Sequence, residues 1–504
     1  MSKANPLLPT LSIALLILVC LEGCSKKKSE LVWEMNIPAI GSESSPRTTD
    51  LNGDGVLDIV IGAGRNETQF SDHGILALNG KTGELLWKQE APDQVYGSAT
   101  LCDITGDGVK DVFIGGRSPH FKAINGKTGE VIWKYQYELV KHDSILQYAR
   151  FNFNNSVLVP DQNNDGLQDL LTVNGGNSLA YPNSEENRFP GVLILFDSKT
   201  GNIIASDTMP DGKESYMSPL CFAQPGTKEY KIIFGTGGET ISGNLYMAKL
   251  SDLMERKLMN SKVIATEVGH GFIAPASLAD ISTDGNYDIV AISHKSTVFA
   301  VDGVSHSLLW KQALPNTESS NSMAVGYFTN DDVPDFFTFV SQGKWPTNTG
   351  SLQVMLNGRD GHIEYTDSIG CTGFSSPVVY DLNNDGQDEA IISINNFDCS
   401  RGFTDQTLFE IENKLIAIDF RKKRIQTIDQ MKEFKNIFST PWLGDLDNDG
   451  YLDIVHCQYY SRSGLLVFLG MNTKRISTPI KIRKLPLWGA YMGSNGDGIF
   501  AKEK

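Results

Sequence analysis

The sequence is poor in cysteine, histidine and positive charge, and it has no hydrophobic run long enough to cross a bilayer as a helix. Its 504 residues include 7 Cys and 8 His, and 44 Lys and Arg stand against 60 Asp and Glu. The resulting net charge of −16 argues against a nucleic-acid partner, because phosphate binding requires basic patches. There is no CxxC or vicinal cysteine pair, so the cysteines do not indicate a metal or redox centre.

Apolar residues are plentiful enough for a packed core, with 40% hydrophobic and 9% aromatic residues. No segment shows the long amphipathic period of a helix-rich protein. The 48 Gly must therefore lie mainly in turns, and we expect an all-β protein.

Residues 1–23 are predicted to be a lipoprotein signal peptide. Lys3 precedes an apolar run from Leu11 to Leu21, about 11 residues, whereas a spanning helix needs roughly 20. The run ends in Leu-Glu-Gly-Cys24, which resembles a bacterial lipobox and implies that Cys24 becomes a lipidated N-terminus. Residues 24–30 then form a polar tether, and we expect a lipoprotein of the bacterial cell envelope, in the outer membrane and facing the periplasm or the surface. An ordinary signal peptide with an incidental Cys is the alternative.

Five cysteines follow Cys24, and because five is odd, at least one is unpaired. Of the possible pairs, Cys371 and Cys399 are the best candidates for a disulfide, although the sequence favours buried free thiols at least as strongly.

A short acidic motif recurs at a long period, which indicates a repeat architecture. Six clear copies are Asp50–Gly62, Asp103–Gly115, Asp161–Val173, Asp280–Ile292, Asp381–Ser393 and Asp445–Cys457. Two wide gaps predict degenerate copies, at Gly326–Phe339, where Tyr327 replaces the first Asp, and at Ala223–Gly235. Eight units of roughly 55 residues therefore fill the chain, with seven as the alternative.

Each unit contains a second motif, in which Asn-Gly and Thr-Gly dipeptides separate two short apolar runs. Close copies are Ala77–Trp87, Ala123–Trp133 and Ala300–Trp310. These dipeptides indicate hairpins, because Gly supplies the positive φ of a tight turn. Four antiparallel strands per unit, repeated radially, predict a single β-propeller domain over residues 31–504.

Both ends of the chain resemble the outermost strand of a unit. Glu30–Met35, which carries Trp33, has no strands before it and is predicted to pair with the last blade. Ile480–Gly493, which carries Trp488, is predicted to form another outermost strand that leads into a new innermost one.

The spacing D-x-[NDTS]-x-D-G-x-x-[DE] places side-chain oxygens at positions 1, 3, 5 and 9 of a tight loop. Ca²⁺ takes 6 to 8 oxygens, and Gly at position 6 permits the turn. A β-branched run follows position 9 at once, so the loop joins two strands and an EF-hand is excluded. An Asp/Asn/Gly turn without metal is the alternative, but three or four carboxylates crowded into one empty loop would repel one another.

We predict up to six structural Ca²⁺ ions. The predicted ligands are Asp50, Asn52, Asp54, Asp58, Asp103, Thr105, Asp107, Asp111, Asp161, Asn163, Asp165, Asp169, Asp280, Ser282, Asp284, Asp288, Asp381, Asn383, Asp385, Glu389, Asp445, Asp447, Asp449 and Asp453. Thr105 and Ser282 predict weaker sites, because a hydroxyl is a poorer calcium ligand than a carboxylate. Tyr327 and the region of Ala223 predict two blades without a cation.

At these residues the chain resembles the FG-GAP repeat family, which includes the integrin α-subunit propeller. That resemblance implies a propeller with calcium loops between the first two strands of a blade. The Trp-bearing hairpins are similar to repeats of the pyrroloquinoline quinone dehydrogenases, at Ala77, Thr82, Gly83 and Trp87. The vicinal Cys-Cys that many of those enzymes carry is absent, so we expect no pyrroloquinoline quinone.

A ligand face is predicted opposite the calcium loops, because the loops between strands 2 and 3 and between blades share that side of a propeller. Insertions there are Asn174–Pro190, Gly237–Gly243, Ser341–Gly350 and Asn395–Asn413. The candidate ligand residues are Arg117, His120, Tyr181, Trp345, Phe397 and Arg401. Exposed aromatics and Arg serve glycan or protein contacts, while the alternative is that they anchor their own loops.

The sequence therefore predicts a monomeric, lipid-anchored, calcium-binding propeller that binds a protein or a glycan. A glycan-active enzyme resembling a polysaccharide lyase and an envelope-assembly lipoprotein are the alternatives. The sequence contains no compact catalytic signature, although catalytic groups drawn from separate loops would not be visible in it.

Overall fold

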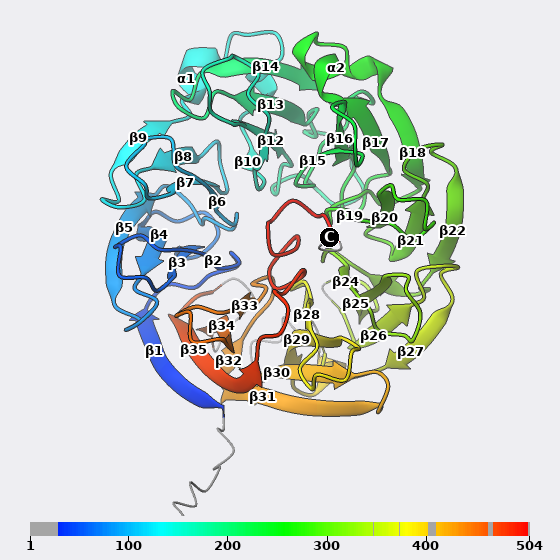
Figure 1. Cartoon of the computed structure of the whole chain (residues 1–504). Coiled ribbons are helices and arrows are strands. Elements are labelled where there is room, and N and C mark those ends of the chain that lie inside the picture. The colour runs from blue at the N-terminus through cyan, green and yellow to red at the C-terminus, as the bar shows by residue number, and fades with distance from the viewer. Residues whose placement is uncertain (1–28, 346, 372, 402–409, 462–466, 502–504) are drawn as a thin grey trace, which may run out of the picture.

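The computed structural model describes residues 29–345, 347–371, 373–401, 410–461 and 467–501. These residues form eight antiparallel sheets arranged radially around a central axis (Figure 1). The predicted eight-bladed β-propeller is confirmed, including the two blades that contain the degenerate repeats. The predicted signal peptide, Cys24 and most of the tether lie outside the described residues.

Each blade runs from an innermost strand beside the axis to an outermost strand at the rim (Figure 1). Blade 1 contains β2 (Arg47–Thr49), β3 (Asp58–Gly62), β4 (Ser71–Leu78) and β5 (Leu85–Ala91). Blade 2 contains β6 (Thr100–Cys102), β7 (Asp111–Gly115), β8 (Phe121–Ile124) and β9 (Val131–Lys134). Blade 3 contains β10 (Asn152–Phe153), β11 (Val157–Val159), β12 (Asp169–Gly175), β13 (Val192–Phe196) and β14 (Ile203–Thr208). Blade 4 contains β15 (Leu220–Ala223), β16 (Tyr230–Gly235), β17 (Gly243–Lys249) and β18 (Lys262–Glu267).

The second half of the ring follows the same order. Blade 5 contains β19 (Ser277–Ala279), β20 (Asp288–Ile292), β21 (Thr297–Val301) and β22 (Leu308–Ala313). Blade 6 contains β23 (Thr317–Glu318), β24 (Ala324–Gly326), β25 (Asp335–Gln342), β26 (Gly350–Leu356) and β27 (Ile363–Asp367). Blade 7 contains β28 (Val378–Tyr380), β29 (Glu389–Asn396), β30 (Glu412–Asp419) and β31 (Arg424–Lys432). Blade 8 contains β32 (Phe434–Lys435), β33 (Trp442–Gly444), β34 (Tyr451–Tyr460), β35 (Gly470–Lys481) and β1 (Glu30–Pro38).

Helical segments are few and short among the described residues. They are α1 (Tyr137–Val140) and α2 (Leu250–Met254), with the 3₁₀ turns η1 (Leu146–Tyr148), η2 (Leu258–Asn260) and η3 (Cys399–Arg401). Within the described chain, no helix has the length and apolar character needed to cross a membrane.

The middle strands of the blades form the core. Every residue of β3, β7 and β20 is buried, because each blade packs between two neighbours. This two-sided burial explains why these segments are continuous Val, Ile and Phe runs and do not alternate between apolar and polar residues.

The N-terminal strand closes the ring, as predicted. β1 pairs antiparallel with β35, from Glu30 opposite Ser477 to Pro38 opposite Gly470. The outermost strand of blade 8 therefore comes from the opposite end of the chain, and the ladder between β1 and β35 joins the first and last elements of the propeller.

Tryptophans on the outermost strands of four blades bind each of them to the next blade. Trp33 Nε1 in blade 8 donates a hydrogen bond to Gly80 O in blade 1 at 2.7 Å. Gly83 has φ +77°, and a Cβ there would lie 2.7 Å from the Trp33 ring, so only Gly fits this turn. Equivalent bonds join Trp87 to Gly126, Trp133 to Ser198 and Trp310 to Gly358.

The prediction for the C-terminal segment is wrong. Residues 482–501, which we call the C-terminal plug, leave blade 8 and cross the centre of the ring (red in Figure 1). Trp488 O accepts the N–H of Val379 at 2.9 Å, and Gly489 O accepts the N–H of Leu443 at 2.7 Å. An innermost strand has no neighbour on its axis side, so its backbone groups are free to bind the plug.

The side chains of the C-terminal plug complete the core around the axis. Trp488 and Met492 are each 1% exposed. Arg47 of β2 donates to Tyr491 O at 2.7 Å, and a Cβ on Gly496 would lie 2.7 Å from the Arg47 guanidinium. The C-terminal plug is therefore part of the folded propeller.

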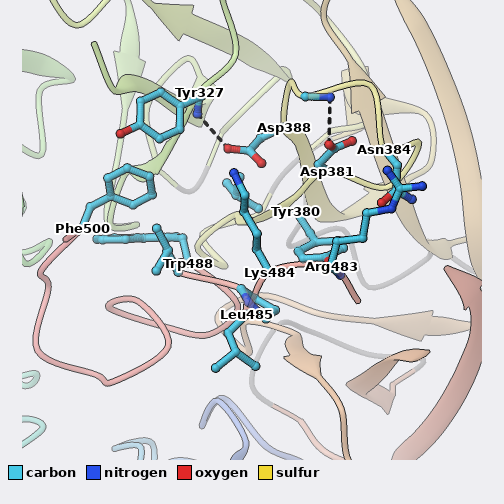
Figure 2. A pocket seen from close by; sticks show the side chains of 14 residues that line it. Tyr327, Tyr380, Asp381, Asn384, Asp388, Arg483, Lys484, Leu485, Trp488 and Phe500 are labelled. Atoms are coloured by element: carbon cyan, nitrogen blue, oxygen red, sulfur yellow. Dashed lines mark hydrogen bonds between the residues drawn. The ribbon is translucent and has the colours of Figure 1, made fainter. Parts of the chain in front are cut away.

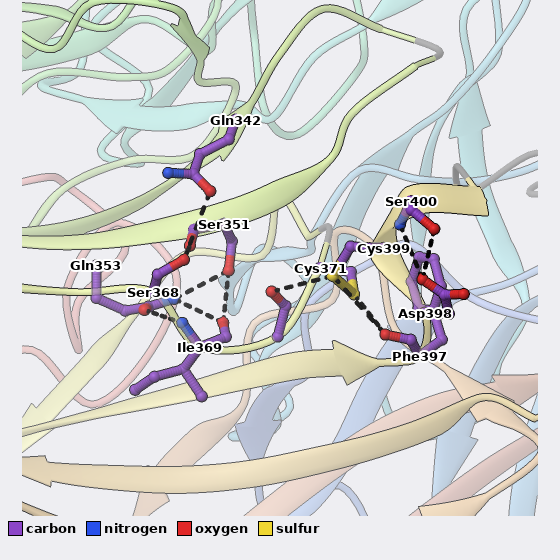
Figure 3. The surroundings of a disulfide bond; sticks show 11 residues. Gln342, Ser351, Gln353, Ser368, Ile369, Cys371, Phe397, Asp398, Cys399 and Ser400 are labelled. Carbon is purple, nitrogen blue, oxygen red and sulfur yellow. Dashed lines mark hydrogen bonds between the residues drawn. A yellow bond between two sulfur atoms is a disulfide. The ribbon is translucent and has the colours of Figure 1, made fainter.

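A disulfide joins Cys371 and Cys399, the pair that the sequence left open between a disulfide and free thiols, with 5.3 Å between the Cα atoms (Figure 3). Cys371 precedes β28, and Cys399 lies in the connection between β29 and β30. The bond therefore ties this connection to the segment that enters the same blade. Cys102, Cys221 and Cys457 are free thiols.

Candidate functional site

The six acidic loops join the first two strands of their blades, and each wraps around its own first Asp. Asp50 accepts hydrogen bonds from the N–H groups of Gly53 at 2.7 Å and Gly55 at 3.0 Å, and Asp54 accepts one from Val56 at 2.9 Å. In all six loops the N–H at position 6 donates to position 1 and the N–H at position 7 donates to position 5. The shared motif thus gives a shared loop conformation.

The carboxylate at position 9 has a structural role that the motif did not reveal. Asp58 is fully buried, and its two oxygens accept the N–H groups of Leu51 and Gly80, each at 2.9 Å. Burial raises the pKa of Asp58. Asp335 in the degenerate loop of blade 6 makes the same pair of bonds, to Phe328 and Gly358. In blades 1, 2, 5 and 6, position 9 therefore joins the loop to the turn between strands 3 and 4, whether or not the loop keeps the full motif.

The loop of blade 3 has an oxygen suited to a cation. Asp169 Oδ1 is buried and has no hydrogen-bond partner among the described residues. Burial raises the pKa of Asp169 to about 6, and the nearby Asp161 and Asp197 carboxylates add to the rise. A bound Ca²⁺ would satisfy this oxygen and relieve the repulsion, so the donor set fits a hard cation.

In blade 8 three carboxylates already converge. Oxygens of Asp445, Asp447 and Asp453 lie within 4.8 Å of one another. Arg475 of β35 reaches the same place, with its side chain 3% exposed, and donates to Asp453 at 2.9 and 3.1 Å and to Asp447. Blade 8 has no turn between strands 3 and 4, because its outermost strand is β1, so Arg475 replaces the Gly N–H that Asp58 binds in blade 1.

Blade 7 also carries a cation at its loop. Lys422 Nζ lies 2.9 Å from Asp385 and 3.1 Å from Asp419. Asn383 donates to Glu389, whose pKa is raised to about 8 by burial and by the neighbouring Asp419 carboxylate. The loops of blades 7 and 8 thus differ from the other four in having a basic side chain within reach of their ligands.

The remaining predicted ligands lie where the motif places them. Thr105 and Ser282 occupy position 3 of their loops, and the N–H of each donates to the position-9 carboxylate, Asp111 or Asp288. In blade 6, Tyr327 occupies the position that the first Asp has in an intact motif. Its backbone N–H donates to Asp388 of the neighbouring loop at 2.8 Å.

On the opposite face, the predicted ligand residues fall into separate environments. Tyr181 is 78% exposed on the connection between β12 and β13. Arg117 instead forms an ion pair with Glu67 at 2.7 Å and lies over the Tyr96 ring at 5.4 Å. His120 is buried, and burial lowers its pKa to about 3, so it is not exposed for contact with a ligand.

Trp345 and Phe397 pack together with neighbouring aromatics. Both are half-buried and contact one cluster on blades 6 to 8, in which Trp345 lies 6.5 Å from Phe374. This packing matches the alternative in which aromatics anchor their own loops. The side chain of Arg401 lies outside the described part of the structure.

A Ser–His–Asp arrangement that sequence spacing did not reveal lies between blades 7 and 8. Ser393 Oγ is 3.1 Å from His456 Nε2, and His456 Nδ1 is 3.6 Å from Asp429. Ser393 is fully buried and its Oγ also lies 3.2 Å from Asn413 Oδ1, while Lys474 pairs with Asp429 at 2.9 Å. A nucleophile must reach a substrate, so this network is an interior link between blades.

Residues 73–262 match the family model described as the FAM234A/B beta-propeller. No curated protein sequence matches the chain. Among solved structures, a europium-containing methanol dehydrogenase is similar at 10% identity and a TM-score of 0.57, over 89% of this chain and 93% of that one. Quinohemoprotein alcohol dehydrogenases from Pseudomonas putida HK5 (9% identity, TM-score 0.55) and Comamonas testosteroni (10%, 0.52) are similar over 90% and 91% of this chain, and over 77% of each of theirs. At such identities the likeness concerns the propeller fold alone.

Proposed function

We propose that the protein is an exported, lipid-anchored β-propeller that binds Ca²⁺ in its acidic loops and a protein or a glycan on its opposite face. The observation that carries the binding role is the connection between β12 and β13. Leu179 and Tyr181 there are 82% and 78% exposed, while Arg188 of the same connection pairs with the buried Glu214, which lies between β14 and β15. Arg188 also donates to Tyr181 O at 3.1 Å. Apolar side chains held outward on a fixed loop are organised for contact before a partner arrives.

The calcium part of the proposal is supported by the orphaned oxygen of Asp169 and by the shared wrapping of the six loops. Calcium in these loops is structural, because it would bind the folded state in preference to the unfolded chain. Metal analysis of the purified protein should find bound calcium, and EGTA should lower the melting temperature. An equal melting temperature with and without EGTA would contradict the proposed calcium binding.

The ligand role is tested by incubating the protein with a glycan panel and scoring both retention and shorter products. Tyr181→Ala should abolish retention. Tyr230→Ala is the matched control. Tyr230 is also exposed, but it begins β16 and therefore lies on the side of the acidic loops, away from the proposed ligand face. If both variants retained glycans equally well, the connection between β12 and β13 would not be the binding site.

The same experiment separates the alternatives. Shorter products would favour a glycan-active enzyme on this scaffold. Neither retention nor products would favour a protein partner, including the envelope-assembly role, and cross-linking through a photoreactive residue at position 179 would then identify it.

The lipid anchor rests on the lipobox resemblance at Cys24. Cells expressing the protein should incorporate labelled palmitate into it, and Cys24→Ser should abolish the label and release the protein from membranes. Retention of the label by Cys24→Ser would contradict lipidation at this residue.

A further inference from the structure

A pocket of about 560 Å³ lies where the C-terminal plug meets blades 6 and 7 (Figure 2). The plug forms one wall, and the loop that begins at Asp381 and the segment around Tyr327 form the others. The pocket is on the side of the acidic loops and is separate from the ligand face proposed above. A volume of this size suits a small organic ligand.

The floor of the pocket is aromatic. Phe500 lies 5.5 Å from the Tyr327 ring and 6.5 Å from the Trp488 ring, measured between centroids. Leu485 at the rim is 63% exposed. Trp488 and Phe500 are only 1% and 5% exposed, so a flat apolar ring would bury its face against Leu485 and the exposed part of Tyr327.

The polar atoms of the pocket favour a ligand that accepts hydrogen bonds. The acceptors are engaged: both Asp381 oxygens accept amides of their own loop, at 3.1 and 2.9 Å, and Asp388 accepts the N–H of Tyr327 at 2.8 Å. The donors are less engaged. Trp488 Nε1 is buried and has no hydrogen-bond partner among the described residues.

The C-terminal plug also contributes two positively charged side chains to the lining of the pocket. Arg483 and Lys484 are exposed and line the pocket, and neither forms an ion pair within the described part of the chain. Lys484 points toward Asp388 (Figure 2), and Arg483 and Asn384 both line the pocket. Asp381 and Asp388 in the same lining already accept amide N–H groups, so the exposed ammonium and guanidinium groups are the ones that can hold a negatively charged ligand.

We propose that this pocket binds a small organic anion with an apolar ring. The ring lies against Tyr327 and Leu485, above the floor that Trp488 and Phe500 complete, and the acidic group is held by Arg483 and Lys484. Because Leu485, Arg483 and Lys484 belong to the C-terminal plug, the site exists only when the plug is seated across the ring.

The test uses two probes with the same ring system. 1-Anilinonaphthalene-8-sulfonate carries a negative charge, and N-phenyl-1-naphthylamine is its uncharged counterpart. Titrated into the full mature protein with calcium present, the sulfonate should bind saturably at one site and the amine at least about tenfold more weakly. Equal affinities for the two probes would overturn the proposal.

Variants locate the site. The double variant Arg483→Gln/Lys484→Gln should weaken sulfonate binding about tenfold or more, while Arg424→Gln/Lys432→Gln, which removes two exposed cations from β31, should leave it unchanged. Leu485→Glu should weaken binding and Leu485→Lys should strengthen it. Leu485 is exposed, so neither substitution should disturb folding, and a change in affinity reports on binding. Loss of binding in the β31 control, or the same effect from Glu and Lys at position 485, would overturn the proposal.

Discussion

The loops Asp50–Asp58 in blade 1 and Asp445–Asp453 in blade 8 carry the same motif in different surroundings. In blade 1 the buried Asp58 is satisfied by two backbone N–H groups, one of them from the Gly80 turn of its own blade. In blade 8 that turn does not exist, and Arg475 binds Asp453 and Asp447 instead.

The difference teaches that the spacing of the motif alone does not rank the affinities of the proposed calcium sites. A guanidinium already pairs with two of the carboxylates in blade 8, so a cation would gain less there than in blade 1. Lys422 places blade 7 between the two cases, since it pairs with Asp385 at 2.9 Å from an exposed position. We therefore expect the loops of blades 1 and 3 to hold calcium more tightly than the loop of blade 8.

The largest expected effect is the loss of Asp453. Asp453→Ala leaves the buried Arg475 guanidinium without its main partner, and breaking such a pair costs about 3–5 kcal/mol. Urea unfolding measures the loss of stability. The control Asp449→Ala removes an exposed carboxylate of the same loop and should cost about 1 kcal/mol or less. Similar costs for both variants would mean that Arg475 does not depend on Asp453.

Loss of Asp58 should have the next largest effect. Asp58→Ala leaves two buried N–H groups, of Leu51 and Gly80, without an acceptor, at a cost of about 2–3 kcal/mol. Asp58→Asn keeps one acceptor oxygen and should lose about half as much. The measurement is urea unfolding in EGTA, so that calcium does not contribute. Equal losses for the two variants would contradict the bonding described for Asp58.

Calcium itself should distinguish the two loops. Asp54 and Asp449 occupy position 5 in blades 1 and 8, so Asp54→Ala and Asp449→Ala are matched changes. A site saturated at 100 times its Kd stabilises the fold by about 2.7 kcal/mol. Asp54→Ala should remove more of the calcium-dependent rise in melting temperature than Asp449→Ala, as measured by calorimetry with and without EGTA. The reverse order would contradict the role given to Arg475.

The smallest expected effect is on pH dependence in the absence of calcium. The pKa of Glu389 is raised from 4.5 to about 8, first by burial and then by neighbouring carboxylates, so the folded state prefers its protonated form. The corresponding stability is present below pH 4.5 and is lost as the pH rises through about 8. In EGTA, Glu389→Gln should therefore reduce the decline of stability between about pH 5 and 8, the range between the unfolded and the folded pKa of Glu389. If the substitution left the pH dependence of stability unchanged, that result would contradict the raised pKa of Glu389.

Local patterns predicted most of the fold. The acidic motif and the Asn-Gly hairpins gave eight blades because each pattern is contained in one blade, and Trp33 identified the closing strand because β1 repeats a strand found elsewhere. The C-terminal plug was missed for the same reason. Trp488 resembles an outermost strand locally, but its backbone partner Val379 is more than a hundred residues away.

The place of the acidic loops in the blades was predictable from the motif, but the side chains that surround them were not. The motif names Asp447 and Asp453, but nothing in their spacing indicates Arg475 from β35. Likewise the loop position of Trp345 was clear, whereas its packing against Phe374 depends on the adjacent blade. Side-chain burial between blades is a tertiary property that a repeat pattern does not encode.

The closing strand β1 also determines how the molecule bears mechanical load. Any pull on the segment before Glu30 reaches first the end of the ladder at which Glu30 lies opposite Ser477. A pull along the strand loads all the ladder bonds at once, while an outward pull peels them one pair at a time. Trp33 stands near the loaded end, and its bond to Gly80 shares the force with blade 1. The strand that closes the ring is thus the one through which a tether at this end would transmit tension.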